Sequence, residues 1–206
     1  MIILGTNSIK DTGYDVANSL RFNDGSSDYL NRTQSSGDTQ KFTISLWTKL
    51  SFDSSSNEIV LINTNSTTNI HEALRLKTNN SLKFFSYNGS FQVNLETNRL
   101  FRDVSAWYHI VVAVDTTQGT ASNRVKLYIN GVQETSFATE TYPSQNYNFV
   151  GINVNNQPFE IGARARLNEQ YFDGYMSEVV FINASQLDPT SFGEFDEDSG
   201  IWKPID

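Results

Sequence analysis

Histidine and carboxylate side chains are the groups in this sequence whose types would support catalysis. The chain has two histidines, His71 in a polar segment and His109 in an apolar one, and no cysteine. Nucleophilic catalysis needs a base beside a serine, threonine or cysteine, and the sequence lacks a Gly-x-Ser-x-Gly motif. A mononuclear metal centre built on histidine has no support either. We therefore expect His109 to be a core residue and His71 to be solvated.

An acidic run near the end of the sequence comes closest to a glycosidase site. Glycoside hydrolysis needs two carboxylates on either side of the scissile bond. Glu194 and Asp196 match the start of the Glu-x-Asp-x-Glu pattern of sandwich glucanases, but the closing position holds Asp198. The run also follows the last strong strand pattern. We interpret residues 194–198 as an acidic surface loop and expect the protein not to be an enzyme.

Aromatic and amide side chains in predicted loops form a candidate sugar site. Exposed rings stack on pyranose faces, and neighbouring amides or carboxylates bond to the hydroxyl groups. The loop 141–156 offers Tyr142, Tyr147 and Phe149, and Tyr87 stands beside Asn88. These five residues are the glycan-binding candidates. The alternative is that the rings cover the end of the domain or fill an interface.

Carboxylates also raise the question of a metal ion. Calcium prefers clustered oxygen ligands, and the available carboxylates include Asp24, Asp28, Asp173 and Glu178. No EF-hand spacing is present. We expect no metal site and no other cofactor, and the alternative is a calcium ion that joins the N-terminal strand to the last one.

Charge and hydropathy limit the classes of partner. The formal net charge of −8 repels nucleic acid and anionic membranes, so we expect neither as a partner. No apolar run approaches the roughly 20 residues of a membrane span. The start of the sequence is too short and lacks the basic flank of a signal peptide, so we expect synthesis in a cytoplasm.

Alternating apolar residues predict the strands that position these groups. Segments 107–115 and 124–130 alternate, and Asn130-Gly131 between apolar runs is typical of a type I′ hairpin turn. Both faces of 107–115 are mostly apolar, as in a strand at the centre of stacked sheets. The sequence predicts an all-β fold, a two-sheet antiparallel β-sandwich. Further strands are expected at 19–23, 28–32, 39–50, 58–63, 73–77, 82–87, 91–95, 159–163 and 171–182, and a helical turn at 188–193.

Five motifs carry a resemblance to a known family. They are Phe42-Thr-Ile-Ser-Leu-Trp47, Trp107-Tyr-His-Ile-Val-Val-Ala-Val114, Val125-Lys-Leu-Tyr-Ile-Asn-Gly131, Ile161-Gly162 and Asp173-Gly-Tyr-Met-Ser-Glu-Val179. In this order they resemble laminin-G-like domains, which are concanavalin A-like lectin/glucanase jelly rolls. The resemblance spans about residues 19–183. Many relatives carry aspartate where this chain has Ser177, which lowers the expectation of calcium. The fold hosts lectins, glycosidases and adhesion modules alike.

A narrower resemblance concerns the ends of the domain. Asn18–Asn23 with Ser27–Arg32, and Leu187–Glu194 with Asp198–Pro204, resemble laminin-G-type domains of tailed-bacteriophage virion proteins. Because this chain stops soon after the last motif, we expect a stand-alone virion protein that decorates the capsid surface. Its partners would be other capsid or tail proteins, with a homo-oligomer left open. The alternative is a glycan-binding adhesin or tail-fibre module that recognises a host surface saccharide.

These resemblances divide the chain into three parts. We expect an N-terminal arm at 1–18, a laminin-G-like jelly roll at 19–187, and a C-terminal helical turn and tail at 188–206. Apolar residues in the two terminal arms need not belong to the sandwich core. Those predicted to attach the protein to a neighbouring subunit are Ile2, Ile3, Leu4 and Trp202.

Overall fold

The computed structural model describes residues 18–51, 58–67 and 70–205 of the 206-residue chain. The predicted arm lies outside the described residues apart from Asn18, and so do the assembly candidates Ile2, Ile3 and Leu4. The described part of the chain has no helix that is long and apolar enough to cross a membrane.

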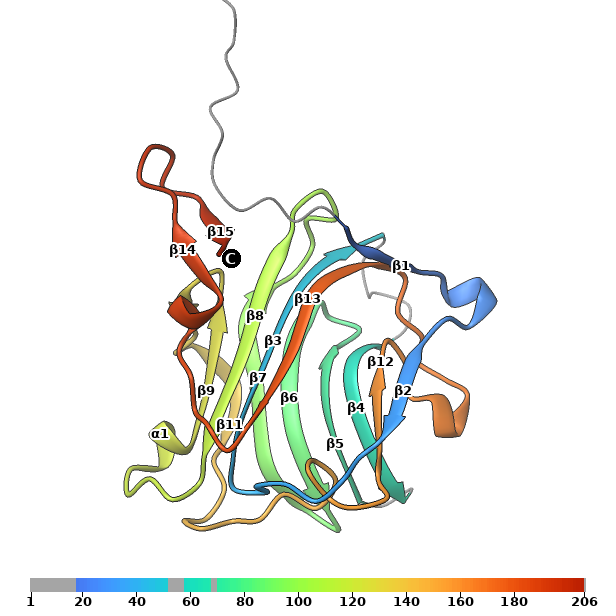
Figure 1. The fold of residues 1–206 in the computed structure, drawn as a ribbon, viewed down its shortest axis with the longest axis vertical. Coiled ribbons are helices and arrows are strands. Elements are labelled where there is room, and N and C mark those ends of the chain that lie inside the picture. Colours follow the sequence, from blue (N-terminus) through green and yellow to red (C-terminus); the bar gives the residue numbers. More distant parts are fainter. Residues whose placement is uncertain (1–17, 52–57, 68–69, 206) are drawn as a thin grey trace, which may run out of the picture.

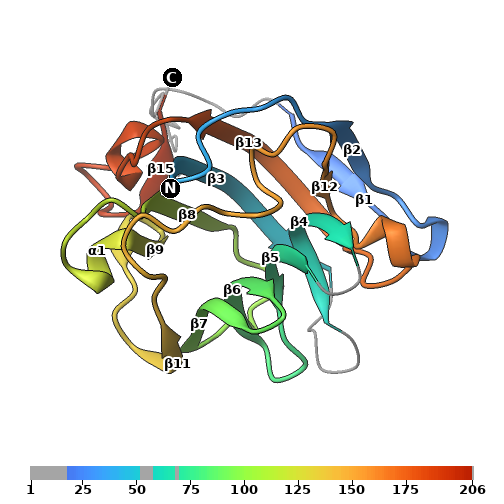
Figure 2. The same cartoon turned by 90° about the horizontal axis from the view of Figure 1, so that it is seen from below.

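Two antiparallel sheets packed face to face make up the domain, which confirms the predicted all-β sandwich (Figures 1 and 2). Within the described residues, the six-stranded sheet has the order β1 (Leu20–Phe22), β13 (Gly174–Asn183), β3 (Lys41–Leu50), β8 (Tyr108–Asp115), β9 (Val125–Ile129) and β10 (Val132–Gln133). The seven-stranded sheet has the order β11 (Phe137–Thr141), β7 (Phe91–Leu100), β6 (Ser81–Asn88), β5 (Ile70–Leu76), β4 (Ile59–Thr67), β12 (Pro158–Ile161) and β2 (Leu30–Thr33).

Short helical turns and one hairpin complete the described elements. The helical turns are η1 (Asp24–Ser26), α1 (Ala121–Arg124), η2 (Ala165–Leu167) and η3 (Pro189–Ser191). The helical turn expected at 188–193 is η3, in which the Asp188 side chain accepts a hydrogen bond from the Thr190 amide. After it, β14 (Gly193–Phe195) pairs with β15 (Trp202–Pro204) as a separate two-stranded hairpin.

The central strands follow the predicted alternation. β8 pairs with β3 on one side and β9 on the other, and seven of its eight residues are buried. Asn130 and Gly131 both have positive φ, 48° and 80°, and connect β9 to β10 as the type I′ signal predicts. Between the sheets, the ring of Phe149 packs edge-on against Phe42, with centroids 5.0 Å apart.

Trp202 attaches the C-terminal hairpin to the outer side of the six-stranded sheet. Its indole lies nearly parallel to the buried ring of His109, with centroids 5.9 Å apart, and its Nε1 donates a hydrogen bond of 2.9 Å to His109 Nδ1. Trp47 stacks on the same imidazole, with centroids 4.7 Å apart. Trp202 is only 8% exposed within its own chain. The burial of Trp202 within its own chain argues against its prediction as an assembly residue. His109 is buried, as predicted, but it lies between the six-stranded sheet and the hairpin and not in the core between the two sheets.

The His109 ring is held in one tautomer. An indole N–H can only donate, so Nδ1 of His109 is the acceptor and Nε2 carries the proton. Nε2 lies 2.8 Å from the Ser45 hydroxyl, which accepts that proton's hydrogen bond. Burial lowers the pKa of His109 to about 4 from its ordinary 6.5, because the imidazolium would lose its hydration.

Glu72 fixes the loop that crosses one end of the sandwich. One oxygen of its buried carboxylate accepts from the Val150 amide and the Ser86 hydroxyl, and the other from the Ile152 amide and the Thr64 hydroxyl. Gly151 lies between the two amides, where a Cβ atom would come within 2.4 Å of the Glu72 carboxylate. Burial raises the pKa of Glu72, and the four donors oppose that rise.

We predict that Glu72→Gln lowers the free energy of unfolding by about 3 kcal/mol. The amide keeps one acceptor oxygen and turns an NH₂ group toward two donors that the carboxylate had satisfied. Urea unfolding monitored by fluorescence measures the change. Glu197→Gln, on the exposed turn of the C-terminal hairpin, is the matched control and should leave the midpoint unchanged. Equal midpoints for both variants would contradict the role of Glu72.

We also predict that acid destabilises the domain through His109. Because its pKa is about 4 in the folded chain and 6.5 when unfolded, the unfolded state binds the proton first as pH falls. Stability is therefore intact above pH 6.5 and decreases down to about pH 4, by at most about 3 kcal/mol. Unfolding curves at several pH values should show a shallower decrease for His109→Gln. An unchanged slope would show that another group controls acid unfolding.

Candidate ligand-binding face

The face of the seven-stranded sheet that points away from the core carries the candidate site. On β5 and β6, the residues Leu74, Leu76, Leu82 and Phe84 belong to the core. Since successive side chains of a strand point to opposite faces, the residues between them project outward. We call this surface the outer face; its central residues are Asn63, His71, Ala73, Arg75, Lys83, Phe85, Tyr87, Phe91, Asn94, Glu96 and Glu160.

A row of paired residues crosses the outer face from strand to strand. Glu160 pairs with Asn63, Asn63 with Ala73, Ala73 with Phe85, and Phe85 with Asn94. The Asn63 amide donates a hydrogen bond of 2.7 Å to the Glu160 carboxylate. The row therefore places two amides on either side of a small alanine and an aromatic ring.

Aromatic rings cover one side of this row, where β6 turns into β7. Tyr87 pairs with Phe91 across the hairpin, and their ring centroids are 5.1 Å apart. Phe91 also packs edge-on against Phe85, at 5.8 Å, while 43% of its surface remains exposed. His71 meets Phe85 edge-on at 5.0 Å and lies 6.1 Å from Tyr87. The hairpin thus presents a partly exposed aromatic platform.

Cationic side chains border the other side of the row. The Arg75 guanidinium lies 4.6 Å from the Phe85 ring centroid and bonds to Glu58 at 2.8 Å. Arg164, from the segment between β12 and β13, bonds to Glu169 at 2.9 Å. Lys83 lies over the Phe91 ring at 4.4 Å. Cations, amides and rings therefore meet on one surface.

Several buried polar atoms on this surface lack a hydrogen-bond partner among the described residues. Such groups cost about 1–3 kcal/mol each and are uncommon in folded proteins. Deviations of this kind are expected at functional sites, where the missing partner is not part of the chain. On and beside the outer face, these atoms are Asn63 Oδ1, His71 Nδ1, Arg75 Nε, Asn94 Oδ1, Arg164 Nε and Gln170 Oε1.

Electrostatics at His71 reflect these neighbours. Burial, together with repulsion of the imidazolium by the guanidiniums of Arg164 and Arg75, lowers the pKa of His71 to about 4. Burial also lowers the pKa of Lys83, with added repulsion from Arg75 and Lys77. His71 is half-buried against Phe85, so the expectation of a solvated histidine is wrong.

The structure brings two of the five predicted sugar-binding residues to this surface. Tyr87 lies on the outer face, and Asn88 follows it as an exposed residue of the β6–β7 turn. Phe149 is 2% exposed in the core, so it cannot stack on a sugar. Tyr147 packs against Phe149, and its hydroxyl lies 3.0 Å from that of Ser86 on the inner side of β6. Tyr142 is half-buried and packs against the core.

Sequence reasoning missed Phe91, Arg75 and Arg164. Phe91 was predicted as the start of a strand, and only its pairing with Tyr87 turns it into part of an aromatic surface. A two-residue Asn88-Gly89 turn would place Tyr87 opposite Ser90, but the structure pairs Tyr87 with Phe91, so the turn signal alone does not locate Phe91. Nothing in the local sequence links the loop of Arg164 to Arg75, since the two adjoin only through the order of strands.

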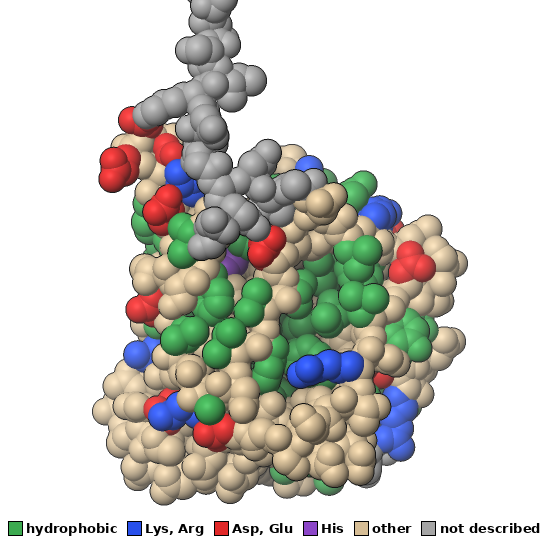
Figure 3. All heavy atoms as spheres, viewed as in Figure 1, with side chains coloured by type: hydrophobic (Ala, Val, Ile, Leu, Met, Phe, Trp, Pro, Cys, Tyr) green, Lys and Arg blue, Asp and Glu red, His purple; other side chains and the backbone are tan. Residues whose placement is uncertain are grey.

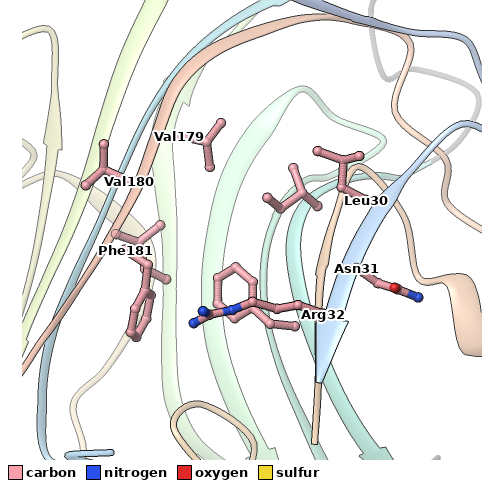
Figure 4. A pocket seen from close by; sticks show the side chains of 9 residues that line it. Leu30, Asn31, Arg32, Val179, Val180 and Phe181 are labelled. Atoms are coloured by element: carbon pink, nitrogen blue, oxygen red, sulfur yellow. The ribbon is translucent and has the colours of Figure 1, made fainter. Parts of the chain in front are cut away.

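A second surface feature is a cleft at the side of the sandwich where β2 and β13 face each other. It has a volume of about 310 Å³ and lies between β2 and β13, lined mainly by apolar side chains such as Leu30, Phe159 and Phe181. Figure 3 shows hydrophobic side chains gathered around it with a basic side chain across it. Figure 4 shows Arg32 extending over the cleft and Asn31 pointing away from it. Its apolar lining offers few groups for a polar ligand.

The carboxylates singled out in the sequence have structural partners. Asp196 closes the β14–β15 turn, where the Ser199 amide and hydroxyl lower its pKa to about 2, and it bonds to Lys203. Asp173 pairs with Arg21. The Ser177 hydroxyl donates to the Asn18 carbonyl. Among the described residues, no three His, Asp or Glu side chains form a group suited to a metal ion.

Comparisons with known proteins show the same fold. A laminin G-type family model, described as the concanavalin A-like lectin/glucanases superfamily, matches residues 24–188. Domain 4 of AbnA, a GH43 extracellular arabinanase from Geobacillus stearothermophilus solved with arabinotriose, is similar at a TM-score of 0.58 and 17% identity over 79% of this chain and 69% of that one. No curated protein matches the chain.

Two further solved structures are similar. The CBM40 of the Ruminococcus gnavus IT-sialidase, bound to α2,3-sialyllactose, gives a TM-score of 0.53 and 13% identity over 80% of this chain and 96% of that one. Domains LG4–5 of the mouse laminin α1 chain give a TM-score of 0.57 and 16% identity. The match covers 86% of this chain and 46% of that one. At these identities the likeness shows the fold. With a family model that covers most of its length, the chain belongs to the concanavalin A-like lectin/glucanases superfamily.

Proposed function

We propose that this protein is a non-enzymatic glycan-binding protein and that the outer face is its saccharide site. The observation that carries the proposal is the meeting of a partly exposed aromatic platform with buried polar groups that lack partners among the described residues. The AbnA domain and the CBM40 that share this fold were solved with arabinotriose and sialyllactose, which supports a saccharide as the ligand class. Glycan recognition thus takes precedence here over the capsid role expected from the sequence.

The site's chemistry suits sugars because it offers two kinds of contact. A pyranose ring has an apolar face, and the exposed part of Phe91 beside Tyr87 gives that face a surface to stack on. Each sugar hydroxyl both donates and accepts a hydrogen bond. Within the part of the chain that the structure describes, the acceptors Asn63 Oδ1 and Asn94 Oδ1 and the donor Arg75 Nε have no partner. These atoms are covered by their neighbours, so binding involves a shift of the covering side chains.

We predict that Phe91→Ala weakens saccharide binding by about tenfold or more, because a stacked ring contributes on the order of 1 kcal/mol beyond its buried area. A glycan array identifies the ligand, and calorimetry gives the dissociation constants. Phe195→Ala removes an equally exposed ring from the C-terminal hairpin and serves as the control. Equal loss of affinity in both variants, or none in either, would place the sugar elsewhere.

A second function, attachment to other virion proteins, is supported by the C-terminal hairpin. Trp202 secures the hairpin to the sandwich, while Phe195 and Ile201 project as exposed apolar residues. Figure 1 shows this hairpin standing apart from the two sheets. We propose that the segment 188–206 is an attachment element. The protein would then reside on a capsid or tail after synthesis in a host cytoplasm. We also propose that the described carboxylates perform no catalysis.

The attachment proposal predicts that Ile201→Asp abolishes co-sedimentation with phage particles that lack the protein. A charge at this position would be buried by any apolar contact that covers it. Val132→Asp, at an equally exposed position of β10, controls for the added charge. Glycan binding should survive in both variants. Undiminished sedimentation of Ile201→Asp would remove the hairpin as the attachment site.

A further inference from the structure

We propose that the outer face selects saccharides that carry a carboxylate, and that Arg164 receives the carboxylate by exchanging Glu169 for it. The inference rests on the proposed function, since it names the chemical class of glycan that the same site takes. It is carried by the arrangement of two guanidiniums beside the aromatic platform. Uronic acids and sialic acids are the sugars that present such a group.

Arg164 has bonding capacity that the described residues do not use. A guanidinium has five N–H groups in a planar fork that matches a carboxylate with two parallel hydrogen bonds. In the structure, Nη1 of Arg164 bonds to Glu169 at 2.9 Å, and its Nε has no partner among the described residues. The Nε–H and a terminal N–H form one edge of the fork. This edge consists of Nε and Nη2, and a ligand carboxylate there would satisfy both. The bound carboxylate would then repel Glu169, which bonds to Nη1, and so favour its departure.

Glu169 is placed to leave when a ligand arrives. Its side chain is 45% exposed, whereas that of Arg164 is 14% exposed. An ion pair with an exposed carboxylate is weak, because water competes for the carboxylate and its side chain loses conformational freedom. Displaced Glu169 returns to solvent, and the more buried Arg164 keeps a negative partner throughout. The exchange therefore requires no charge to be left unpaired in the buried part of the site.

Arg75 provides a second cation beside the first. One terminal nitrogen bonds to Glu58, and its Nε is also unpartnered among the described residues. Glu58 is engaged by Lys77 and Gln170 as well, so it is not free to compete for Arg164. The loop that carries Arg164 reaches Arg75 at Glu58, whose Oε2 bonds to Arg75 at 2.8 Å and accepts from Gln170 Nε2 at 2.9 Å. Both arginines also lower the pKa of His71 by repelling its imidazolium. Because its pKa is about 4, His71 is neutral near pH 7, and the positive charge of the two arginines remains available to an anionic ligand.

Arg75 and the aromatic platform share the Phe85 ring. His71 also lies against this ring, with centroids 5.0 Å apart, and its ring is 6.1 Å from that of Tyr87. Arg75 covers the same Phe85 ring at 4.6 Å. A sugar that stacks on the rings at the β6–β7 hairpin thus directs a ring substituent toward the guanidiniums. A carboxylate is the substituent that these two side chains favour.

The test compares each acidic oligosaccharide with its own methyl ester. Oligogalacturonate and sialyllactose are the probes, and esterification removes the charge while leaving the remaining sugar structure unchanged. We expect the free acids to bind about tenfold or more tighter than the esters at low salt, with the difference reduced by 1 M NaCl. Binding of the esters at equal or higher affinity would overturn the inference while leaving the proposed function intact. Failure of every acidic and neutral glycan would overturn both.

Variants of the exchanging pair make the test specific. Arg164→Gln should abolish the preference for the acid and leave ester binding unchanged, whereas Arg166→Gln, an exposed neighbour on η2, should keep the preference. Glu169→Gln should tighten acid binding several-fold, because the competing carboxylate is gone. Circular dichroism and thermal unfolding confirm that each variant is folded. A preference that persists in Arg164→Gln, or acid binding that weakens in Glu169→Gln, would contradict the exchange.

Discussion

The two-residue period of the strands is the constraint on which the rest of this structure depends. Each strand of the seven-stranded sheet buries one row of side chains between the sheets, as Leu74 and Phe84 do. The apolar area removed from water on that side stabilises the sandwich. The other row of side chains points away from the core, so its residues need not be apolar, and the same strands hold them in fixed positions. That is why Asn63, Phe85 and Asn94 form a straight polar and aromatic line on a rigid surface.

Buried polar groups fall into two kinds in this molecule. Glu72 and His109 have their bonding capacity filled from within the chain, by four donors in one case and by Trp202 and Ser45 in the other. They hold loops and the C-terminal hairpin in place. On the outer face, Asn63 and Asn94 each keep an acceptor without a partner among the described residues. The contrast separates groups that stabilise the fold from groups suited to a ligand.

The fold could be predicted because its signals are local. The alternation of 39–50 and 107–115 and the Asn130-Gly131 turn each lie within one short segment, and the structure has strands and a hairpin there. The candidate site could be predicted only in part. Tyr87 and Asn88 flank a turn that is visible in the sequence, but Phe149 looked like a loop residue and fills the core. Loop composition does not reveal which face of a loop the core covers.

The sequence by itself determined the all-β sandwich, its central strands and the class of residues available for binding, because periodicity and turn chemistry act over a few residues. Only the tertiary structure decided which of those residues meet. Strand order brings the loop that follows β12 to Arg75 of β5, where Gln170 and Arg75 bond to the same Glu58 oxygen, and it brings Trp202 onto His109 of β8. Such contacts arise from register and sheet order over long separations, and no local pattern encodes them.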